Sequence, residues 1–212
     1  MNRKVLLETM RDRIGDEVVQ AMFRVPREIF VPDEIRSQAY EDTPQPIGHG
    51  QTISAPHMVA IMCDILDLQK GMTVLEVGGG SGYHAAVIAE IIGPEGHVYS
   101  VERVPELVSQ ARDNLKQAGI LNVTMVQGDG SAGLPEHAPF DRISVAATAP
   151  SVPEPLKDQL KVGGKLVIPV GVGYQELLLV TRKNGFLVEE KMGVVFVPLI
   201  GEHGFKERRV GL

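Results

Sequence analysis

The stretch LEVGGGSGYHAAVIAE, residues 75–90, joins a short apolar run to a helical pattern through a glycine loop. An α/β sheet places its ligand at such a point, because glycine lets the backbone approach a ligand and the next helix offers free N–H groups. The dinucleotide fingerprint needs a glycine at position 83, which is Tyr here, and the third glycine is Gly82. No Gly-Lys-Ser/Thr follows, so the spacing disfavours both nicotinamide enzymes and P-loop hydrolases.

Acidic residues follow three successive predicted strands. Glu76 ends the strand before the glycine loop, Glu102 ends the strand at 97–102, and Asp129 follows the third strand in QGDGS. A carboxylate suits a ligand with an ammonium group, Glu102 suits ribose hydroxyls, and Asp129 suits the amine of adenine. Together they describe a cationic nucleoside cofactor, S-adenosylmethionine, although each alone could be a solvated loop residue.

Periodicity along the chain predicts the fold class. Apolar residues at helical spacing predict helices over residues 3–14, 16–24 and 56–66, while the polar segment 40–54 has no period. From residue 72 strand patterns alternate with helical ones, and from residue 164 strands follow one another. We therefore expect a Rossmann-like α/β fold with a doubly wound, mostly parallel sheet, antiparallel C-terminal strands and an N-terminal helical extension.

We expect one domain over residues 1–212. Its N-terminal extension, residues 1–66, would carry the loop that meets the substrate, and residues 67–212 would form the cofactor-binding core.

Composition disfavours several other classes. Asp and Glu number 27 against 21 Lys and Arg, a net charge of −6 that argues against a broad nucleic-acid-binding face. No run approaches the ~18–20 apolar residues of a membrane span. The one cysteine, Cys63, lies in an apolar helical run, which favours a cytoplasmic protein with a buried thiol. The histidines show no metal-ligand spacing, and we expect a monomer with no metal, nucleic-acid or membrane partner.

Other motifs resemble those of one family of class I methyltransferases. They are PQPIGHGQTISAPHM (44–58), VQGDGSAGLPEHAPFDRISVAATAP (126–150), LKVGGKLVIPVG (160–171) and VFVPLIG (195–201). With the glycine loop, they stand in the order seen in the protein-L-isoaspartate (D-aspartate) O-methyltransferases, over roughly residues 5–204. That family often has Thr or Ser where this chain has Gly79, and we expect the extra glycine to leave cofactor binding intact.

The resemblance implies a protein repair enzyme. Such an enzyme transfers a methyl group from S-adenosylmethionine to the free α-carboxylate of L-isoaspartyl residues in damaged proteins and peptides. S-adenosylhomocysteine is the second product, and the methyl ester cyclises to a succinimide that partly reopens as aspartate. Activity on D-aspartyl residues stays open.

The resemblance and the carboxylate pattern together assign candidate site residues. The catalytic residue is Ser54. The cofactor-binding residues are Gln51, Thr52, Ser54, Glu76, Gly78, Gly80, Gly82, Glu102, Asp129 and Gly130. The substrate-binding residues are Ile53, Ser54, His57, Val197, Pro198 and Leu199, although for His57 a structural role is slightly favoured over contact with substrate.

Two readings of Ser54 follow from the residues themselves. Its hydroxyl could cap the helix that starts at Pro56, accepting the N–H of His57, or it could orient the substrate carboxylate. The resemblance favours the second. Two rival functions also share this fold class: a small-molecule or nucleic-acid methyltransferase, and a catalytically silent cofactor-binding module.

Overall fold

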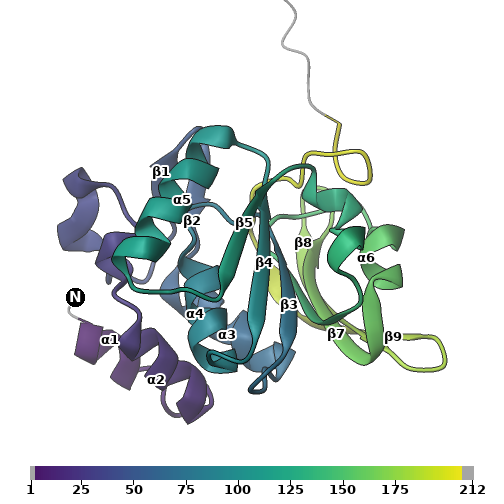
Figure 1. Ribbon diagram of the computed structural model, residues 1–212, viewed down its shortest axis with the longest axis horizontal. Coiled ribbons are helices and arrows are strands. Elements are labelled where there is room, and N and C mark those ends of the chain that lie inside the picture. Colours follow the sequence, from purple (N-terminus) through teal and green to yellow (C-terminus); the bar gives the residue numbers. More distant parts are fainter. Residues whose placement is uncertain (1–2, 207–212) are drawn as a thin grey trace, which may run out of the picture.

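A seven-stranded sheet forms the centre of the protein, whose computed structural model describes residues 3–206 (Figure 1). The strand order is β5-β4-β3-β6-β7-β8-β9; the strands from β5 to β7 in this order pair in parallel, whereas β8 and β9 are antiparallel. The predicted mostly parallel sheet with antiparallel C-terminal strands is confirmed. The strands are β3 Thr73–Val77, β4 His97–Glu102, β5 Val123–Gln127, β6 Phe140–Val145, β7 Leu160–Val170, β8 Gln175–Arg182 and β9 Phe186–Val194.

The direction in which strands are added changes at β3. From β3 the chain adds β4 and β5 on one side, then returns to place β6 on the other side. Connections that diverge in this way leave a crevice at the carboxyl ends of the two central strands. The glycine loop therefore emerges from β3 at the position where the fold leaves room for a ligand.

Alternation along the inner strands separates two cores on the two faces of the sheet. Val74 and Val98 belong to one core, and Leu75 and Val101 to the other. The first core includes side chains of α3, α4 and α5, and the second includes those of α6 and the short turns before β6. The helices are α3 Pro56–Leu66, α4 Tyr83–Ile92, α5 Pro105–Gln117 and α6 Glu154–Asp158.

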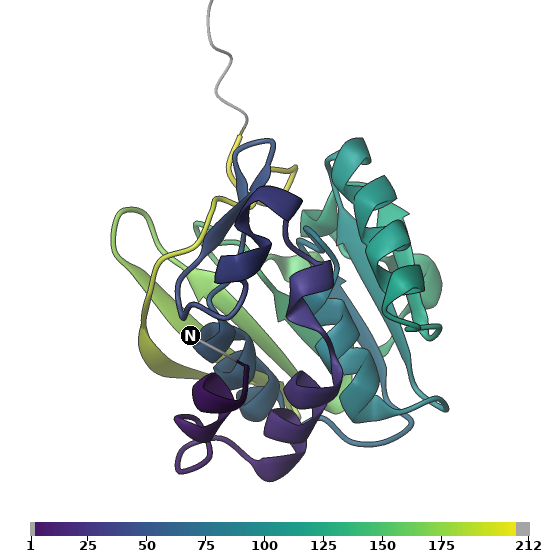
Figure 2. The ribbon, with the colours of Figure 1, turned by 90° about the vertical axis from the view of Figure 1, so that its left-hand side faces the viewer.

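The N-terminal elements cover the first core. Helix α2 packs against α3 and α4, and Figure 2 shows the N-terminal segments in front of these helices. The elements are α1 Arg3–Glu8, α2 Asp16–Arg24, the 3-10 helices η1 Arg27–Ile29 and η2 Asp33–Gln38, and the hairpin strands β1 Gln45–Gly48 and β2 Gln51–Ile53. Among residues 3–206, no helix has the length and apolar character needed to cross a bilayer.

The first predicted helix is shorter than its apolar pattern suggested. The expected helix over residues 3–14 ends at Glu8, and turns follow. Thr9 Oγ1 donates to the carbonyl of Leu6 at 2.6 Å, and the N–H of Met10 bonds to the carbonyl of Leu7 at 3.2 Å, three residues back. A threonine hydroxyl that competes for backbone carbonyls tightens the last turn and ends the helix.

The polar segment 40–54 contains an antiparallel hairpin. Gln45 and Ile53 pair across it, and its turn holds Gly48, His49 and Gly50 at positive φ values of 90°, 52° and 69°. The strands are too short to give a clear alternation, which is why the sequence showed no period there. The helix predicted over residues 56–66 begins and ends where expected.

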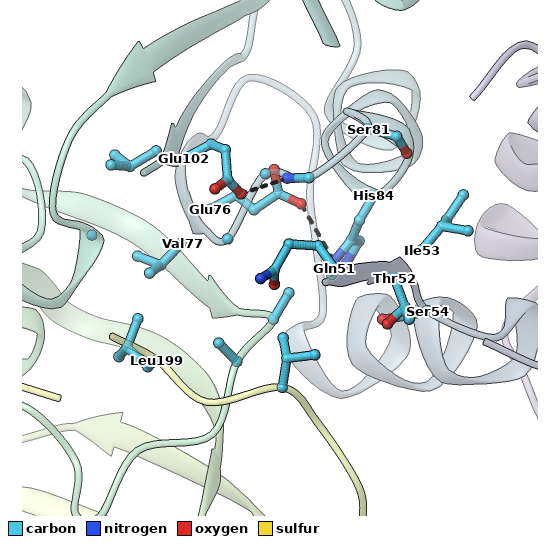
Figure 3. Close-up of a pocket in the computed structure, with 18 of the residues that line it drawn as sticks. Gln51, Thr52, Ile53, Ser54, Glu76, Val77, Ser81, His84, Glu102 and Leu199 are labelled. Carbon is cyan, nitrogen blue, oxygen red and sulfur yellow. Dashed lines mark hydrogen bonds and ion pairs between the residues drawn. The ribbon is translucent and has the colours of Figure 1, made fainter. Parts of the chain in front are cut away.

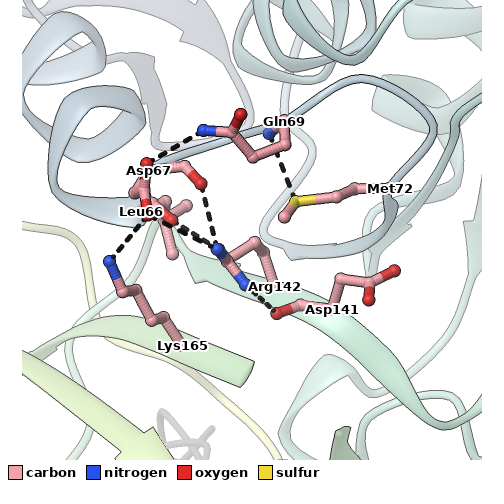
Figure 4. Close-up of polar contacts among 7 residues, drawn as sticks. All are labelled: Leu66, Asp67, Gln69, Met72, Asp141, Arg142 and Lys165. Carbon is pink, nitrogen blue, oxygen red and sulfur yellow. Dashed lines mark hydrogen bonds and ion pairs between the residues drawn. The ribbon is translucent and has the colours of Figure 1, made fainter. Parts of the chain in front are cut away.

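The carboxyl end of α3 is tied to the sheet by Arg142 of β6 (Figure 4). Its guanidinium donates to the carbonyl of Leu66 and, at 3.0 Å, to that of Asp67, while Lys165 of β7 lies 3.1 Å from an Asp67 carboxylate oxygen. Cationic groups at a helix C-terminus satisfy its free carbonyls. This anchoring fixes the helix whose N-terminus follows the hairpin.

Candidate functional site

A pocket opens at the carboxyl ends of β3, β4 and β6, bordered by the hairpin and by the segment 197–200 (Figure 3). It brings together residues that lie far apart in the sequence. Of the residues expected to form the site, those on its wall are Gln51, Thr52, Ile53, Ser54, Glu76, Gly78, Gly80, Glu102, Gly130, Val197, Pro198 and Leu199.

The glycine loop has a backbone that most residues avoid. Gly78, Gly80 and Gly82 have φ values of 89°, 51° and 87°. The N–H groups of Gly78 and Gly79 donate to the carbonyl of Val101, at 2.9 and 3.2 Å. A Cβ on Gly79 would crowd Ser100 Oγ and lie 2.8 Å from Met125 Cε, so the middle one of the three consecutive glycines is required by close packing against β4 and β5.

Glu102 holds the loop in place. One carboxylate oxygen accepts the N–H of Gly80 at 3.0 Å, and the other accepts the N–H of Val104 at 2.9 Å. The side chain is 7% exposed, so it is not a solvated loop residue. Each oxygen keeps a further lone pair for a ligand hydroxyl.

Glu76 is completely buried on the face of β3 that α3 and α4 cover. Ser100 donates its hydroxyl to Oε2, whereas Oε1 has no hydrogen-bond partner and lies 3.5 Å from His84 Nδ1. Burial raises the pKa of Glu76 to about 8. Removal from water disfavours the charged form, and this outweighs the hydrogen bond from Ser100.

His84 is a pocket residue that was not predicted from the sequence. It stands at the start of α4, lines the pocket, and its Nε2 is buried without a partner. Burial lowers the pKa of His84 to about 4. The available signal was a polar ring in YHAAVIAEII, a helix that is otherwise almost wholly apolar.

Two of the predicted cofactor residues do not reach the pocket wall. Asp129 uses one oxygen for the N–H and hydroxyl of Ser131, at 2.9 and 2.7 Å, and the other for the N–H of Glu202, at 2.7 Å. It therefore ties the turn after β5 to the C-terminal segment. Gly82 faces α5, where an added Cβ would lie 3.3 Å from Ala111 Cβ, so its lack of a side chain serves helix packing.

A second, mostly apolar groove adjoins the first pocket. Its walls include Pro44, His57, Met58 and the segment 192–197. Thr52, Ser54, Ala146 and Val197 line both cavities. The hairpin end and one residue of the C-terminal segment thus form the boundary between a polar, glycine-lined pocket and an apolar groove.

The interpretation of Ser54 as a helix cap is wrong. The N-cap position of α3 is Ala55, and no side chain at that position caps the helix. Asp42 accepts the N–H of His57 at 3.0 Å, and the same oxygen lies 2.9 Å from Nδ1 of the ring. Ser54 stands one residue too early to cap, which leaves its hydroxyl available to the two cavities.

A buried arginine, Arg27, holds the backbone at Ser54. Arg27 is fully buried and donates to the carbonyls of Ala39 and Ser54 at 2.7 and 2.8 Å. Its guanidinium lies over the ring of Tyr83, 4.7 Å from the centroid. Burial lowers the pKa of Arg27, and the aromatic face partly offsets that cost. No local pattern in the sequence marks this residue.

Within the described ranges, no cluster of His, Cys, Asp or Glu has the arrangement of a metal site. Cys63 is buried, and burial raises the pKa of its thiol. Polar side chains on the walls of the two cavities include the carboxyl groups of Glu76 and Glu102, the hydroxyl groups of Thr52 and Ser54, and the imidazole of His84.

Comparison with known proteins points to one family. The model of the protein-L-isoaspartate(D-aspartate) O-methyltransferase family matches residues 1–204. A protein-L-isoaspartate O-methyltransferase of Methanothrix thermoacetophila is 64% identical over 207 residues, which cover 98% of this chain and 99% of the relative. One of Hyperthermus butylicus is 57% identical over 204 residues, covering 91% and 85%.

Solved structures give the same result. A protein-L-isoaspartate O-methyltransferase superposes with a TM-score of 0.88 at 33% identity, covering 96% of this chain and 67% of the other. A Plasmodium falciparum protein described as a protein-L-isoaspartate O-methyltransferase, in complex with S-adenosyl-L-homocysteine, superposes with a TM-score of 0.85 at 33% identity, covering 94% and 99%.

Proposed function

The chain belongs to the protein-L-isoaspartate (D-aspartate) O-methyltransferase family, and we infer that it is a protein repair enzyme. It transfers the methyl group of S-adenosylmethionine to the free α-carboxylate of isoaspartyl residues in damaged proteins and peptides. The ester then cyclises to a succinimide, which partly reopens as aspartate. The observation that carries this function is that Thr52 and Ser54 line both cavities, between a pocket for a nucleoside and a groove for a peptide.

The pocket fits a cationic nucleoside. Glu76 has a buried carboxyl oxygen without a partner, which suits the ammonium end of the cofactor, and Glu102 has lone pairs for ribose hydroxyls. Gly78 and Gly80 leave the loop without side chains where the ligand passes. We propose that Gln51, Thr52 and Gly130 complete this binding surface, whereas Gly82 and Asp129 support it from outside.

The reaction makes modest demands on the protein. When bound, S-adenosylmethionine supplies an electrophilic methyl group on a sulfonium. The substrate carboxylate is ionised at pH 7, so no general base is needed. Ser54 orients this carboxylate by donating its hydroxyl, while Ile53 and Leu199, both buried, help to exclude water. Positioning and exclusion of water favour a transfer in which opposite charges are neutralised.

We propose that the peptide lies in the apolar groove. Val197 would contact it from the groove wall, and Pro198 and Leu199 would continue the same segment into the adjoining pocket. His57 would contact it from the α3 side. Residues 1–66 would thus form the substrate side of one domain, and residues 67–212 the cofactor side. Because one chain lines both cavities, we further propose that the protein is a monomer. We also propose that it has no nucleic-acid or membrane partner. A cytoplasmic setting would keep Cys63 reduced.

The direct test is methyl transfer from labelled S-adenosylmethionine to an isoaspartyl peptide beside its aspartyl twin of the same sequence. We expect the labelled methyl group to be incorporated into the isoaspartyl peptide and not into its aspartyl twin. A D-aspartyl peptide in the same assay tests the second activity that the family's description names. Equal labelling of both twins, or labelling of neither, would contradict the function. Gel filtration with light scattering tests the monomer.

A further inference from the structure

Glu76 and His84 form a buried pair whose hydrogen bonding is incomplete. Glu76 is 0% exposed and His84 8% exposed, and both line the pocket (Figure 3). Glu76 Oε1 and His84 Nε2 lack hydrogen-bond partners, and Oε1 lies 3.5 Å from His84 Nδ1. Two buried, unpartnered polar atoms beside a ligand pocket are unusual, because such atoms are normally paired.

Of the residues between 3 and 206 that interact with Glu76, none is a lysine or an arginine. His84 faces it from α4, Ser100 and Glu102 from β4, and Cys63 lies near it on α3. The hydroxyl of Ser100 and the backbone N–H of Ala85 on α4 are neutral donors that favour the carboxylate, and Glu102 is a second acid that disfavours its ionisation. Burial keeps the thiol of Cys63 protonated. His84 is therefore the one basic group among these neighbours.

A single proton can pair Oε1 of Glu76 with Nδ1 of His84 and leaves only Nε2 of the imidazole without a partner. If Oε1 carries a proton, it donates to Nδ1 of His84 after a small rotation, and the buried carboxyl is neutral. If the proton moves to the imidazole, the two groups form an ion pair of the same net charge. In both forms two groups hold one proton, and they titrate as a unit.

We propose that Glu76 and His84 share one proton in the ligand-free enzyme and release it to solvent when the ammonium group of the cofactor binds. The ammonium then replaces the proton as the positive partner of the carboxylate, so the charge of the buried site stays balanced. His84 acts as a positioning residue that keeps the carboxyl neutral and oriented until the ligand arrives. The identity of the ligand rests on the proposed function.

The direction of the pH dependence follows. Burial raises the pKa of Glu76 to about 8 and lowers the pKa of His84 to about 4, so one proton remains on the pair at pH 7. The ligand prefers the deprotonated carboxylate. Its affinity should therefore rise with pH by up to about tenfold per pH unit and level off near pH 8.

The test is calorimetric binding of S-adenosylhomocysteine, which needs no methyl acceptor. The binding enthalpy is measured at pH 7 in phosphate and in Tris, two buffers that differ in protonation enthalpy. The difference between the two binding enthalpies should correspond to about one proton released per site. Kd should fall about tenfold from pH 6 to pH 7. 5′-Methylthioadenosine, which lacks the amino-acid end, should bind without proton release.

Two variants separate the partners. Glu76→Gln should bind S-adenosylhomocysteine more weakly, release no proton and lose the pH dependence. In His84→Asn the amide N–H can donate to the carboxylate and stabilise its ionised form, so proton release at pH 7 should fall below that of the wild type. Wild-type proton release in folded His84→Asn would remove His84 from the inference.

Other outcomes are equally decisive. Binding with no proton release and a constant Kd from pH 6 to pH 8 overturns the inference and leaves the proposed function intact. Equal proton release with 5′-methylthioadenosine also overturns it. Failure of S-adenosylhomocysteine to bind at any pH contradicts the proposed function instead. If a variant does not fold, the ¹⁵N shifts of the His84 ring in the wild type replace it, and shifts that ligand binding leaves unchanged refute the pairing.

Discussion

Ser54 shows how one residue position separates a structural role from a chemical one. Its carbonyl accepts a hydrogen bond from buried Arg27 at 2.8 Å, while Asp42 supplies the cap of the helix that follows. The backbone of Ser54 is thus held and its hydroxyl is not needed for the helix. A rigid backbone with an available hydroxyl suits a group that orients substrate.

Replacing Ser54 with alanine should therefore affect turnover and not stability. We expect Ser54→Ala to lower kcat/KM for an isoaspartyl peptide by about tenfold or more, since about 1.4 kcal/mol of lost transition-state stabilisation is a factor of ten. The measurement is single-turnover methylation at saturating cofactor. The melting temperature and the Kd for S-adenosylhomocysteine serve as controls and should stay near wild type. A wild-type rate in the folded variant would refute the catalytic role.

At the scale of elements, the glycine loop is a turn built for close approach. Gly80 combines a φ of 51° with a place on the pocket wall, and its N–H is held by Glu102 at 3.0 Å. A Cβ at this position would lie 3.2 Å from Ile47 Cδ1 of the hairpin. The glycine loop and the hairpin thus approach each other closely at Gly80, where a side chain would crowd Ile47.

Gly80→Val should abolish binding of S-adenosylhomocysteine, because a β-branched residue is strained at positive φ and its side chain would push against Ile47 of the hairpin beside the pocket. Gly71→Val is the matched control. Gly71 has a φ of 79° with nothing within 4 Å of an added Cβ, so it carries the backbone strain without the pocket contact. Calorimetry should show loss of binding in the first variant alone. Normal binding by Gly80→Val would mean that the loop does not cradle the ligand.

Helix α3 depends on an acidic residue outside it. Asp42→Ala should cost about 0.5–2 kcal/mol of unfolding free energy, the usual range for loss of a side-chain cap. Asp42→Asn keeps an oxygen for the N–H of His57 and should retain most of that stability. Urea unfolding of the two variants, with Ser54→Ala beside them, makes the comparison. If Ser54→Ala were the destabilised protein and Asp42→Ala the stable one, the assignment of the cap would be reversed.

At the scale of the whole molecule, Arg27 joins the N-terminal segments to the cofactor side. It bonds to the carbonyls of Ala39 and Ser54 and stacks on Tyr83 of α4, so three segments meet at one guanidinium. Because the side chain is fully buried, its hydrogen bonds are not exchanged with water. The backbone position of Ser54 therefore depends on Arg27, a residue that precedes every strand of the sheet in the chain.

Arg27→Met should destabilise the protein by about 2–4 kcal/mol, because two buried carbonyls lose their donor. It should also lower kcat, since the backbone of Ser54 is no longer held. Arg24→Met is the control: Arg24 pairs with Glu90 at the surface with a side chain 47% exposed, and such pairs contribute about 1 kcal/mol or less. Thermal melts and methyl-transfer assays of both variants test this. Equal effects of the two substitutions would contradict the role of Arg27.

The sequence by itself determined the sheet, the glycine loop and most of the pocket wall. These features are written in local patterns: the period of apolar residues, glycines where the backbone needs positive φ, and carboxylates at the ends of adjacent parallel strands. Glu76 and Glu102 could be placed together because strand alternation puts them on one face of the sheet. Pro56 in the motif at residues 51–58 marked the start of α3, whereas the hairpin before it was not predicted.

Only the tertiary structure decided which polar groups are partners. Asp42 caps a helix from a loop, Arg27 holds Ser54, and His84 meets Glu76 across a helix–strand contact. Asp129, placed at a strand end like the other two acids, turns away to bind Ser131 and Glu202. Hydrogen bonds of this kind join residues far apart in the chain, and a shift of a few tenths of an ångström in the donor–acceptor distance decides whether they form. No local periodicity records them, because the partner is chosen by packing and by exclusion of water.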